Sequence, residues 1–320
     1  MKTNISQIGF FAQQVLERSR GARVSGIASR GIYLQPENDL TLYLSLEDFR
    51  GPLTLNLEEG STRLEKIKPG CSAQFTSGEM QFPDENITIS LEDSNIWHPS
   101  PVDNEIKIKP GHLDSILSLV NKLIPESPYL PLLSKNPSQI PGMPVIGERI
   151  LNLRNALITG SPEKIAEEST KLLGLGPGLT PLGDDFLLGV LLTLNRWGHI
   201  ILPLRSDIQK SDPESHPTNL VNYLNQIILE NTRLKTTQIS ASLLACAMEG
   251  AADERLLKVL DGLISGSAIT QNELQNLLRW GNSSGITVLA GIISVLKAKD
   301  TVSSQKTVSS SKTYLATLFT

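Results

Sequence analysis

The pattern of hydrophobic and polar positions divides the chain into a β-type half and a helical half. From about residue 23 to residue 109, apolar and polar residues alternate in short runs, which is typical of half-buried strands. The clearest runs are residues 40–46, 53–57 and 87–91, and residues 106–108 form a shorter candidate. Residues 48–52 supply a turn between the first two runs. Several short strands at such spacing favour a small barrel or a sandwich.

A short amphipathic helix precedes these strands, with Ile8, Phe11, Val15 and Leu16 on one face. Helical periodicity returns over residues 112–124. A connector with six prolines follows at 125–144, and we expect an extended linker or a long functional loop on the surface there. Eight further helices are expected at about residues 145–159, 162–173, 181–197, 217–230, 236–250, 253–264, 270–280 and 286–298.

These patterns predict an α+β protein with two domains and a tail. Residues 1–110 would form the β-rich domain with its short N-terminal helix, built as a small β-barrel or a sandwich-like domain. Residues 111–298 would form a mainly helical domain. Residues 299–320 are rich in Ser, Thr and Lys and lack apolar periodicity, so we expect a disordered tail.

Composition narrows the classes of function. The formal net charge of −4, without any Lys/Arg-rich run, argues against a nucleic-acid partner. The most apolar run, residues 186–194, is too short to span a bilayer, and the N-terminus lacks the apolar core of a signal peptide. Cys71 and Cys246 lie far apart in the sequence, and we expect both thiols to be reduced. We therefore expect a cytoplasmic protein without a membrane partner.

The most informative segment is the glycine-rich turn at residues 174–189. Gly174, Gly176 and Gly178 let the backbone turn tightly, and Thr180 followed by Pro181 is a typical helix start. The N-terminus of a helix holds anions through its free N–H groups and its positive dipole end. The segment is neither a Walker A loop nor a Rossmann fingerprint. Its candidate substrate-binding residues are Gly176, Gly178, Leu179, Thr180 and Gly183.

Two adjacent carboxylates, Asp184 and Asp185, fall in the first turn of the helix that follows. A carboxylate there suits the helix dipole, so simple capping is one interpretation. Both would repel a bound anion unless a cation or a proton lay between them and the anion. We therefore treat Asp184 and Asp185 as candidate catalytic residues and as candidate ligands of Mg²⁺, the one cofactor considered.

Two further segments are candidates for the same site. Thr236 and Thr237 precede a helix rich in small residues. Between two glycines, a second turn with small hydroxyl residues opens another helix, and its candidate residues are Asn282, Ser283, Ser284 and Gly285. The alternatives are tight helix packing for the first segment and a plain serine-capped connection for the second.

At these residues the sequence resembles the AllH-type family. The run from Gly174 to Leu187, G-x-GPGLTP-x-GDDFL, is similar to its long signature. Thr236-Thr237 with Ile239-Ser240 resembles a second block, and Gly281-x-x-Ser284-Gly285 a third. The resemblance spans roughly residues 97–296. In the third block the family is expected to carry a His where this chain has Asn282, and often an Asp where it has Thr287.

The resemblance implies a subunit of oxamate carbamoyltransferase, acting in allantoin catabolism, a branch of purine degradation. That transferase exchanges a carbamoyl group between oxalurate plus phosphate and oxamate plus carbamoyl phosphate. It also implies FdrA-like and AllG-like partner subunits and a small anionic substrate. Two other functions stay open: a stand-alone Mg²⁺-assisted enzyme on a phosphorylated or carboxylated metabolite, and a non-catalytic ligand-binding or scaffold subunit.

Overall fold

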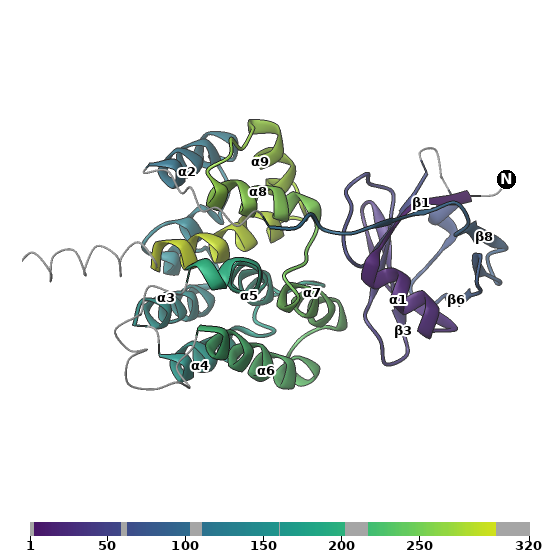
Figure 1. The fold of residues 1–320 in the computed structure, drawn as a ribbon, viewed down its shortest axis with the longest axis horizontal. Helices are drawn as coiled ribbons and strands as arrows, with labels where there is room; N and C mark the ends of the chain where they lie inside the picture. The colour runs from purple at the N-terminus through teal and green to yellow at the C-terminus, as the bar shows by residue number, and fades with distance from the viewer. Residues whose placement is uncertain (1–2, 59–62, 103–110, 160, 202–216, 299–320) are drawn as a thin grey trace, which may run out of the picture.

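The fold was analysed in a computed structural model, which describes residues 3–58, 63–102, 111–159, 161–201 and 217–298. A β-barrel lies at one end of the molecule and a group of helices at the other (Figure 1). The α+β class and the order of its two parts are therefore as the sequence predicts, and the barrel is the correct one of the two β architectures considered.

Eight strands close the barrel in the order β5-β4-β3-β2-β6-β7-β8-β1, and β1 pairs back to β5. A ninth strand, β9, is added alongside β1. The strands are β1 (Thr3–Gly9), β2 (Gly21–Ala28), β3 (Gly31–Pro36), β4 (Leu42–Ser45), β5 (Thr54–Leu57), β6 (Ser72–Phe75), β7 (Glu79–Phe82), β8 (Ile87–Ser90) and β9 (Asn95–Trp97). The candidate strand at residues 106–108 lies outside the described residues.

The first element differs from the expectation. Ile8 belongs to β1, and the helix α1 spans Phe10–Arg18. Residues 3–9 form a strand because their backbone pairs with β5 on one side and with β8 and β9 on the other, which closes the barrel. Tertiary pairing thus overrides the local helical pattern.

The connection between β4 and β5 also differs from a simple turn. The two strands pair in parallel, with Tyr43 opposite Thr54, so residues 46–53 must carry the chain back to the same end of the barrel. We call this segment the 46–53 loop. The side-chain amide of Asn56 holds it, donating hydrogen bonds to the carbonyls of Glu47 (2.7 Å) and Phe49 (2.9 Å).

All of the expected helices are present, with ends shifted by a few residues. They are α2 (His112–Leu123), α3 (Pro144–Thr159), α4 (Pro162–Leu172), α5 (Leu182–Ile201), α6 (Pro217–Lys235), α7 (Gln238–Met248), α8 (Glu254–Ser265), α9 (Gln271–Leu278) and a last helix over residues 284–298. Among the described residues, no helix has the length and apolar character to cross a membrane.

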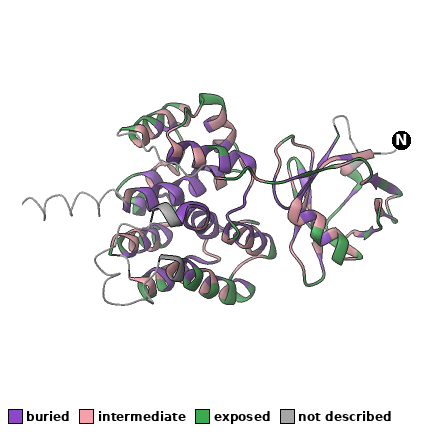
Figure 2. Cartoon of the chain, in the orientation of Figure 1, coloured by how far each residue is buried: buried purple, intermediate pink, exposed green. Residues whose placement is uncertain are grey.

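Helix α5 and the 284–298 helix form the centre of the helical part, and both are buried over most of their length (Figure 2). Glycines let their backbones approach closely. A Cβ on Gly189 would lie 2.1 Å from the carbonyl of Val288, and one on Gly291 would lie 2.2 Å from the carbonyl of Phe186. This contact fixes the positions of the two helices relative to each other.

The proline-rich connector is not a surface linker, contrary to expectation. It contains two short 3-10 helices, η2 (Leu130–Leu133) and η3 (Pro137–Gln139), and buries Leu132 and Ile140 in the helical core. Arg154 of α3 donates hydrogen bonds to the carbonyls of Ser134 (2.8 Å) and Leu132. These bonds satisfy backbone groups that a buried non-helical segment would otherwise leave unpaired.

The chain has two hydrophobic cores, one inside the barrel and one among the helices. The barrel contacts α7, where the Thr41 amide donates to Ser242 Oγ (2.8 Å), and α8, where Arg50 Nη2 lies 2.7 Å from Glu254 Oε2. Cys246 of α7 packs into the barrel core. The predicted boundary at residue 110 and the predicted tail at 299–320 fall outside the described residues.

Candidate functional site

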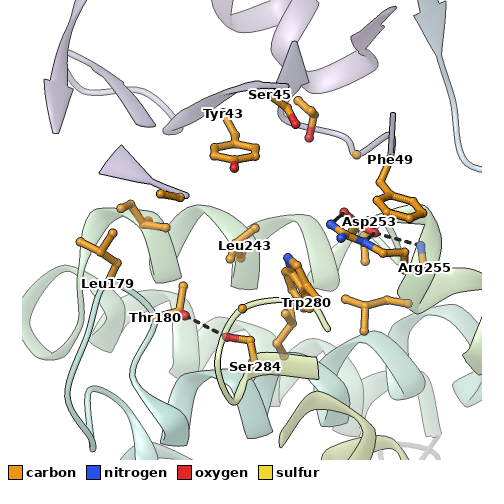
Figure 3. A pocket seen from close by; sticks show the side chains of 18 of the residues that line it. Tyr43, Ser45, Phe49, Leu179, Thr180, Leu243, Asp253, Arg255, Trp280 and Ser284 are labelled. Carbon is orange, nitrogen blue, oxygen red and sulfur yellow. Dashed lines mark hydrogen bonds and ion pairs between the residues drawn. The ribbon is translucent and has the colours of Figure 1, made fainter. Parts of the chain in front are cut away.

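A cavity of about 750 Å³ lies where the barrel meets the helices. Figure 3 shows side chains entering it from both parts. The barrel side is formed by β3, β4 and the 46–53 loop, including Tyr33, Tyr43, Glu47 and Phe49. The helical side is formed by α7, the start of α8 and both predicted turns, including Gly178, Thr180, Arg255, Trp280 and Ser284. The two turns, more than 100 residues apart in the sequence, are therefore brought to one place.

The three glycines of the turn have positive φ angles: +73° at Gly174, +115° at Gly176 and +104° at Gly178. L side chains rarely adopt such angles. At Gly174 a Cβ would also lie 1.8 Å from the carbonyl of Lys235, whereas at Gly178 it would meet open space. Within the described part of the chain, the N–H groups of Gly178, Leu179 and Thr180 make no hydrogen bond. The backbone at Gly178 therefore faces the cavity with donors available to a ligand.

Asp184 is directed toward the protein rather than the cavity. One carboxylate oxygen accepts the N–H of Gly174 (2.7 Å) and the other accepts the hydroxyl of Thr236. Burial raises the pKa of Asp184, and these two bonds oppose the rise. Asp184 thus ties the glycine turn to the segment before α7, and Thr236 is its partner in that contact. Among the described residues, neither of them lines the cavity.

Thr237 fixes the turn from the same side. Its hydroxyl caps α7 by accepting the N–H of Ser240 (3.1 Å) and donates to the carbonyl of Leu179 (2.6 Å). Gly183 lies behind the turn, where a Cβ would be 2.0 Å from the carbonyl of Leu172. These contacts shape the turn, and direct ligand binding by Thr236, Thr237, Gly176 or Gly183 stays a prediction.

Asp185 is a buried carboxyl with an incomplete set of partners. Only 2% of the residue is exposed, and Oδ2 has no hydrogen-bond partner among the described residues. Burial raises its pKa to about 8, the charge of Asp184 adds to the rise, and the hydroxyls of Ser284 and Thr180 act against it. At neutral pH Asp185 therefore mostly holds a proton. A neutral Asp185 exerts less repulsion on an anion than a charged one would.

The two turns meet through their hydroxyl groups. Thr180 Oγ1 lies 3.3 Å from Ser284 Oγ (Figure 3). The expected N-cap at Thr180 is not seen among the described residues: α5 begins at Leu182, and the N–H of Gly183 donates to the carbonyl of Leu175 (2.8 Å). In the second turn Ser283 and the exposed Asn282 line the cavity, while Gly285 packs against the carbonyl of Leu277.

Arg255, which the sequence analysis did not select, lies on the cavity wall. Its guanidinium sits 4.2 Å from the centre of the Phe49 ring and 5.9 Å from that of Trp280. Nε and Nη2 donate to Asp253 (2.9 and 2.8 Å), and Nη1 lies 3.5 Å from Glu47. Burial disfavours the charge, but the two carboxylates outweigh it and the pKa of Arg255 is raised.

Tyr33 and Tyr43 face each other across β3 and β4, with ring centres 4.8 Å apart. Burial raises the pKa of Tyr33 to about 12, helped by the charge of Asp185, and it also raises that of Tyr43. Both phenols are neutral in the physiological range. Both residues line the cavity, where a phenol hydroxyl can donate or accept a hydrogen bond.

Two sequence signals pointed to these missed residues. Tyr33 and Tyr43 occupy the outward positions of strands whose inward positions are apolar, and outward-facing aromatic residues mark binding surfaces. Arg255 stands in the first turn of a helix, where a cation opposes the dipole. The association of these residues with the glycine turn depends on the packing of the barrel against the helices, which no local pattern predicts.

The described residues offer few ligands for a cation at the glycine turn. Both oxygens of Asp184 are engaged by Gly174 and Thr236. Among the described residues, no group of three or more His, Cys, Asp or Glu side chains is arranged to hold a metal ion. Mg²⁺ is usually held by one or two carboxylates together with water and substrate phosphates. Mg²⁺ binding by Asp184 and Asp185 therefore stays a prediction.

Comparison with protein families gives one finding for the helical part. Residues 172–296 match the family model described as oxamate carbamoyltransferase subunit AllH. The matched segment contains both turns, Asp184, Asp185 and Arg255, and it leaves out the barrel. The expected resemblance is thereby confirmed over these residues. Comparisons with curated proteins and with solved structures give no match.

Proposed function

We propose that the chain is the AllH-like subunit of a carbamoyltransferase and that its cavity binds a small anion at the two turns. The observation that carries this proposal is the contact between Thr180 and Ser284, which joins two helix starts on the cavity wall. The family match over residues 172–296 supports the reaction class.

The electrostatics of the cavity favour an anion. The N-termini of α5 and of the 284–298 helix both carry positive partial charge. The free N–H groups of Gly178, Leu179 and Thr180 add directed donors. The two carboxylate oxygens of Asp184 are turned toward Gly174 and Thr236. A phosphate or carboxylate group therefore finds donors and little repulsion there.

These groups suit carbamoyl transfer. In the direction of oxalurate formation, the amide nitrogen of oxamate bonds to the carbamoyl carbon, and the bond from that carbon to the phosphate oxygen breaks. The proton that the nitrogen loses ends on the released phosphate. The turn's N–H groups would stabilise the charge that collects on the departing phosphate. In this proposal Asp184 positions the turn, and neutral Asp185 orients the hydroxyls of Thr180 and Ser284.

The partners belong to the same proposal. The matched family is described as a subunit, which implies an assembly of more than one kind of chain. FdrA-like and AllG-like chains are the proposed partners. We expect the isolated chain to bind the anion and the assembled enzyme to carry out turnover.

A thermal-unfolding screen of the purified chain tests the site. The ligands are phosphate, carbamoyl phosphate, oxamate and oxalurate, each with and without Mg²⁺. A ligand at a hundredfold excess over its Kd stabilises the native state by about 2.7 kcal/mol, which raises the midpoint. We expect a shift with carbamoyl phosphate or oxamate, and a clearly smaller shift in Ser284→Ala.

The matched control is Ser267→Ala, which removes a hydroxyl that hydrogen-bonds Ser265 (2.9 Å) outside the cavity. It should keep the full shift. An absence of any shift, both for the chain alone and for the chain co-purified with its proposed partners, would show that the cavity does not bind these anions.

A further inference from the structure

The cavity concentrates the aromatic side chains of a chain that has few of them. The sequence contains three Trp, five Tyr and seven Phe. Five of these side chains line the cavity: Tyr33, Tyr43, Phe49, Tyr129 and Trp280. Phosphate, carbamoyl phosphate and oxamate have no ring for these residues to contact. The faces of these rings therefore have no stacking partner in the small anions of the proposed function.

The volume of the cavity also favours a ligand larger than these small anions. Carbamoyl phosphate is much smaller than a nucleoside monophosphate, which carries a sugar and a heterocycle in addition to its phosphate. The cavity measures about 750 Å³, which is within the range of pockets for nucleotide- or drug-sized ligands.

The aromatic residues surround the space next to the turns. Tyr43 projects from the barrel toward the helices, and Trp280 stands on the helical side, with Leu243 of α7 between them in the view of Figure 3. Trp280 is four residues before Ser284, so the ring-binding surface and the anion-binding hydroxyls belong to one turn. Planar groups stack well on tyrosine and tryptophan because these rings are large and apolar on their faces.

The cavity also contains polar groups that can bind a sugar or the edge of a heterocycle. Tyr33 lines the cavity, and its hydroxyl can donate or accept a hydrogen bond. Glu47 contacts Arg255 only through Oε2, at 3.5 Å, and its side chain is 27% exposed. A carboxylate in that position can accept hydrogen bonds from sugar hydroxyls or from ring N–H groups.

We propose that this cavity binds a phosphorylated ligand with a planar heterocycle, of the size of a nucleoside monophosphate. The phosphate would take the anion position at the two turns, and the ring would lie against Tyr43 and Trp280. The phosphate end of this inference rests on the proposed function, and the ring end rests on the aromatic lining alone. Such a ligand competes with small anions for the turns.

The test is a titration of the purified chain with AMP, adenosine, ribose 5-phosphate and inorganic phosphate, followed by tryptophan fluorescence and by calorimetry. Trp97 and Trp197 are 9% and 1% exposed, and only Trp280 lines the cavity. We expect AMP to quench the Trp280 emission and to bind at least tenfold more tightly than ribose 5-phosphate. Added phosphate should weaken AMP binding.

Variants separate the two ends of the site. Tyr43→Leu and Trp280→Leu should each weaken AMP binding by roughly fivefold to hundredfold, the effect of losing one stacking partner. Both should leave phosphate binding unchanged, while Tyr43→Phe should keep AMP binding because the ring remains. Tyr223→Leu is the control, because Tyr223 is exposed on α6 and does not line the cavity.

If AMP binds no more tightly than ribose 5-phosphate while carbamoyl phosphate or oxamate binds, the inference is wrong and the proposed function stands. If AMP binds and none of the small anions does, the inference stands for the ring and the small-anion function is wrong. Equal AMP affinity in wild type, Tyr43→Leu and Trp280→Leu would place the nucleotide elsewhere and overturn the inference. Circular dichroism of each variant checks that it is folded.

Discussion

The hydroxyl oxygens of Thr180 and Ser284 lie 3.3 Å apart, although 104 residues separate them in the chain. The close approach of α5 and the 284–298 helix at Gly189 and Gly291 makes this contact possible, because it sets the two helix starts side by side. The distance between these two hydroxyls therefore depends on how α5 packs against the 284–298 helix.

A double-mutant cycle measures this contact. Thr180→Val and Ser284→Ala should each lower the free energy of unfolding by about 1 kcal/mol, and the two effects should couple by about 0.5–1.5 kcal/mol because they remove the same hydrogen bond. Urea denaturation gives the three values. Anion affinity should fall about tenfold in each single variant. Strict additivity of the two changes would mean that the hydroxyls do not interact in solution.

Asp184 and Asp185 should respond differently to removal of the charge. Asp184→Asn puts an NH₂ group where one carboxylate oxygen now accepts a hydrogen bond from Gly174 or from Thr236, so we expect a loss of about 1–3 kcal/mol in unfolding free energy. Asp185→Asn replaces a neutral acid of similar shape and should cost less than about 1 kcal/mol at pH 7. Denaturant unfolding of both variants compares the costs. A larger loss in Asp185→Asn than in Asp184→Asn would contradict the assignment of roles.

The raised pKa of Asp185 predicts a pH dependence of stability. Its pKa rises on folding from 3.8 to about 8, so between these values the native state holds a proton that the unfolded state has released. The contribution of Asp185 is most favourable below about pH 4, falls as the pH rises through this window, and is fully lost above about pH 8. One proton sets an upper limit of about 1.4 kcal/mol per pH unit.

Unfolding free energies of wild type and Asp185→Asn from pH 5 to pH 9 isolate this effect. The stability of wild type relative to the variant should decrease as the pH rises, and it should level off above about pH 8. The affinity for a small anion should also weaken as Asp185 becomes charged. A difference between the two proteins that stays constant with pH would show that Asp185 has an ordinary pKa.

Glu254 should be important for the attachment of the barrel to the helices. Its carboxylate accepts the backbone N–H of Arg50 (2.8 Å) and two guanidinium N–H groups of Arg50 (3.2 and 2.7 Å). Glu254→Gln should lower the free energy of unfolding by about 1–3 kcal/mol, because charge-assisted hydrogen bonds are lost. Calorimetry should show a lower midpoint. The control Glu230→Gln removes an exposed carboxylate on α6 and should change stability by less than about 0.5 kcal/mol.

The sequence allowed correct prediction of features that depend on local chemistry. Glycines at positive φ, such as Gly174 and Gly178, and the periodicity of α5 are properties of short segments. The meeting of the two turns was also expected, because each turn opens a helix and offers free N–H groups. Burial of Asp185 and its proton were outside what the sequence indicates, since they depend on the hydroxyls of Thr180 and Ser284 around it.

Features that depend on non-local pairing were missed. The strand at residues 3–9 follows from its pairing with β5, and the parallel pairing of β4 with β5 follows from barrel closure. The proline-rich connector packs against the core because Arg154 binds its carbonyls. In each case the pairing depends on how the barrel closes or how the helical core packs, so a local pattern carries no information about it.

The cavity takes one wall from the helices and the other from the barrel, and the family match at residues 172–296 covers only the helical wall. A chain that kept these helices and carried a different barrel would retain the two turns on the helical wall, and the opposite wall of the cavity would differ. Tyr33, Tyr43 and Phe49 would be replaced, while Thr180 and Ser284 would remain. Ligand choice can therefore diverge through the β half alone, without any change in the segment by which such proteins are recognised.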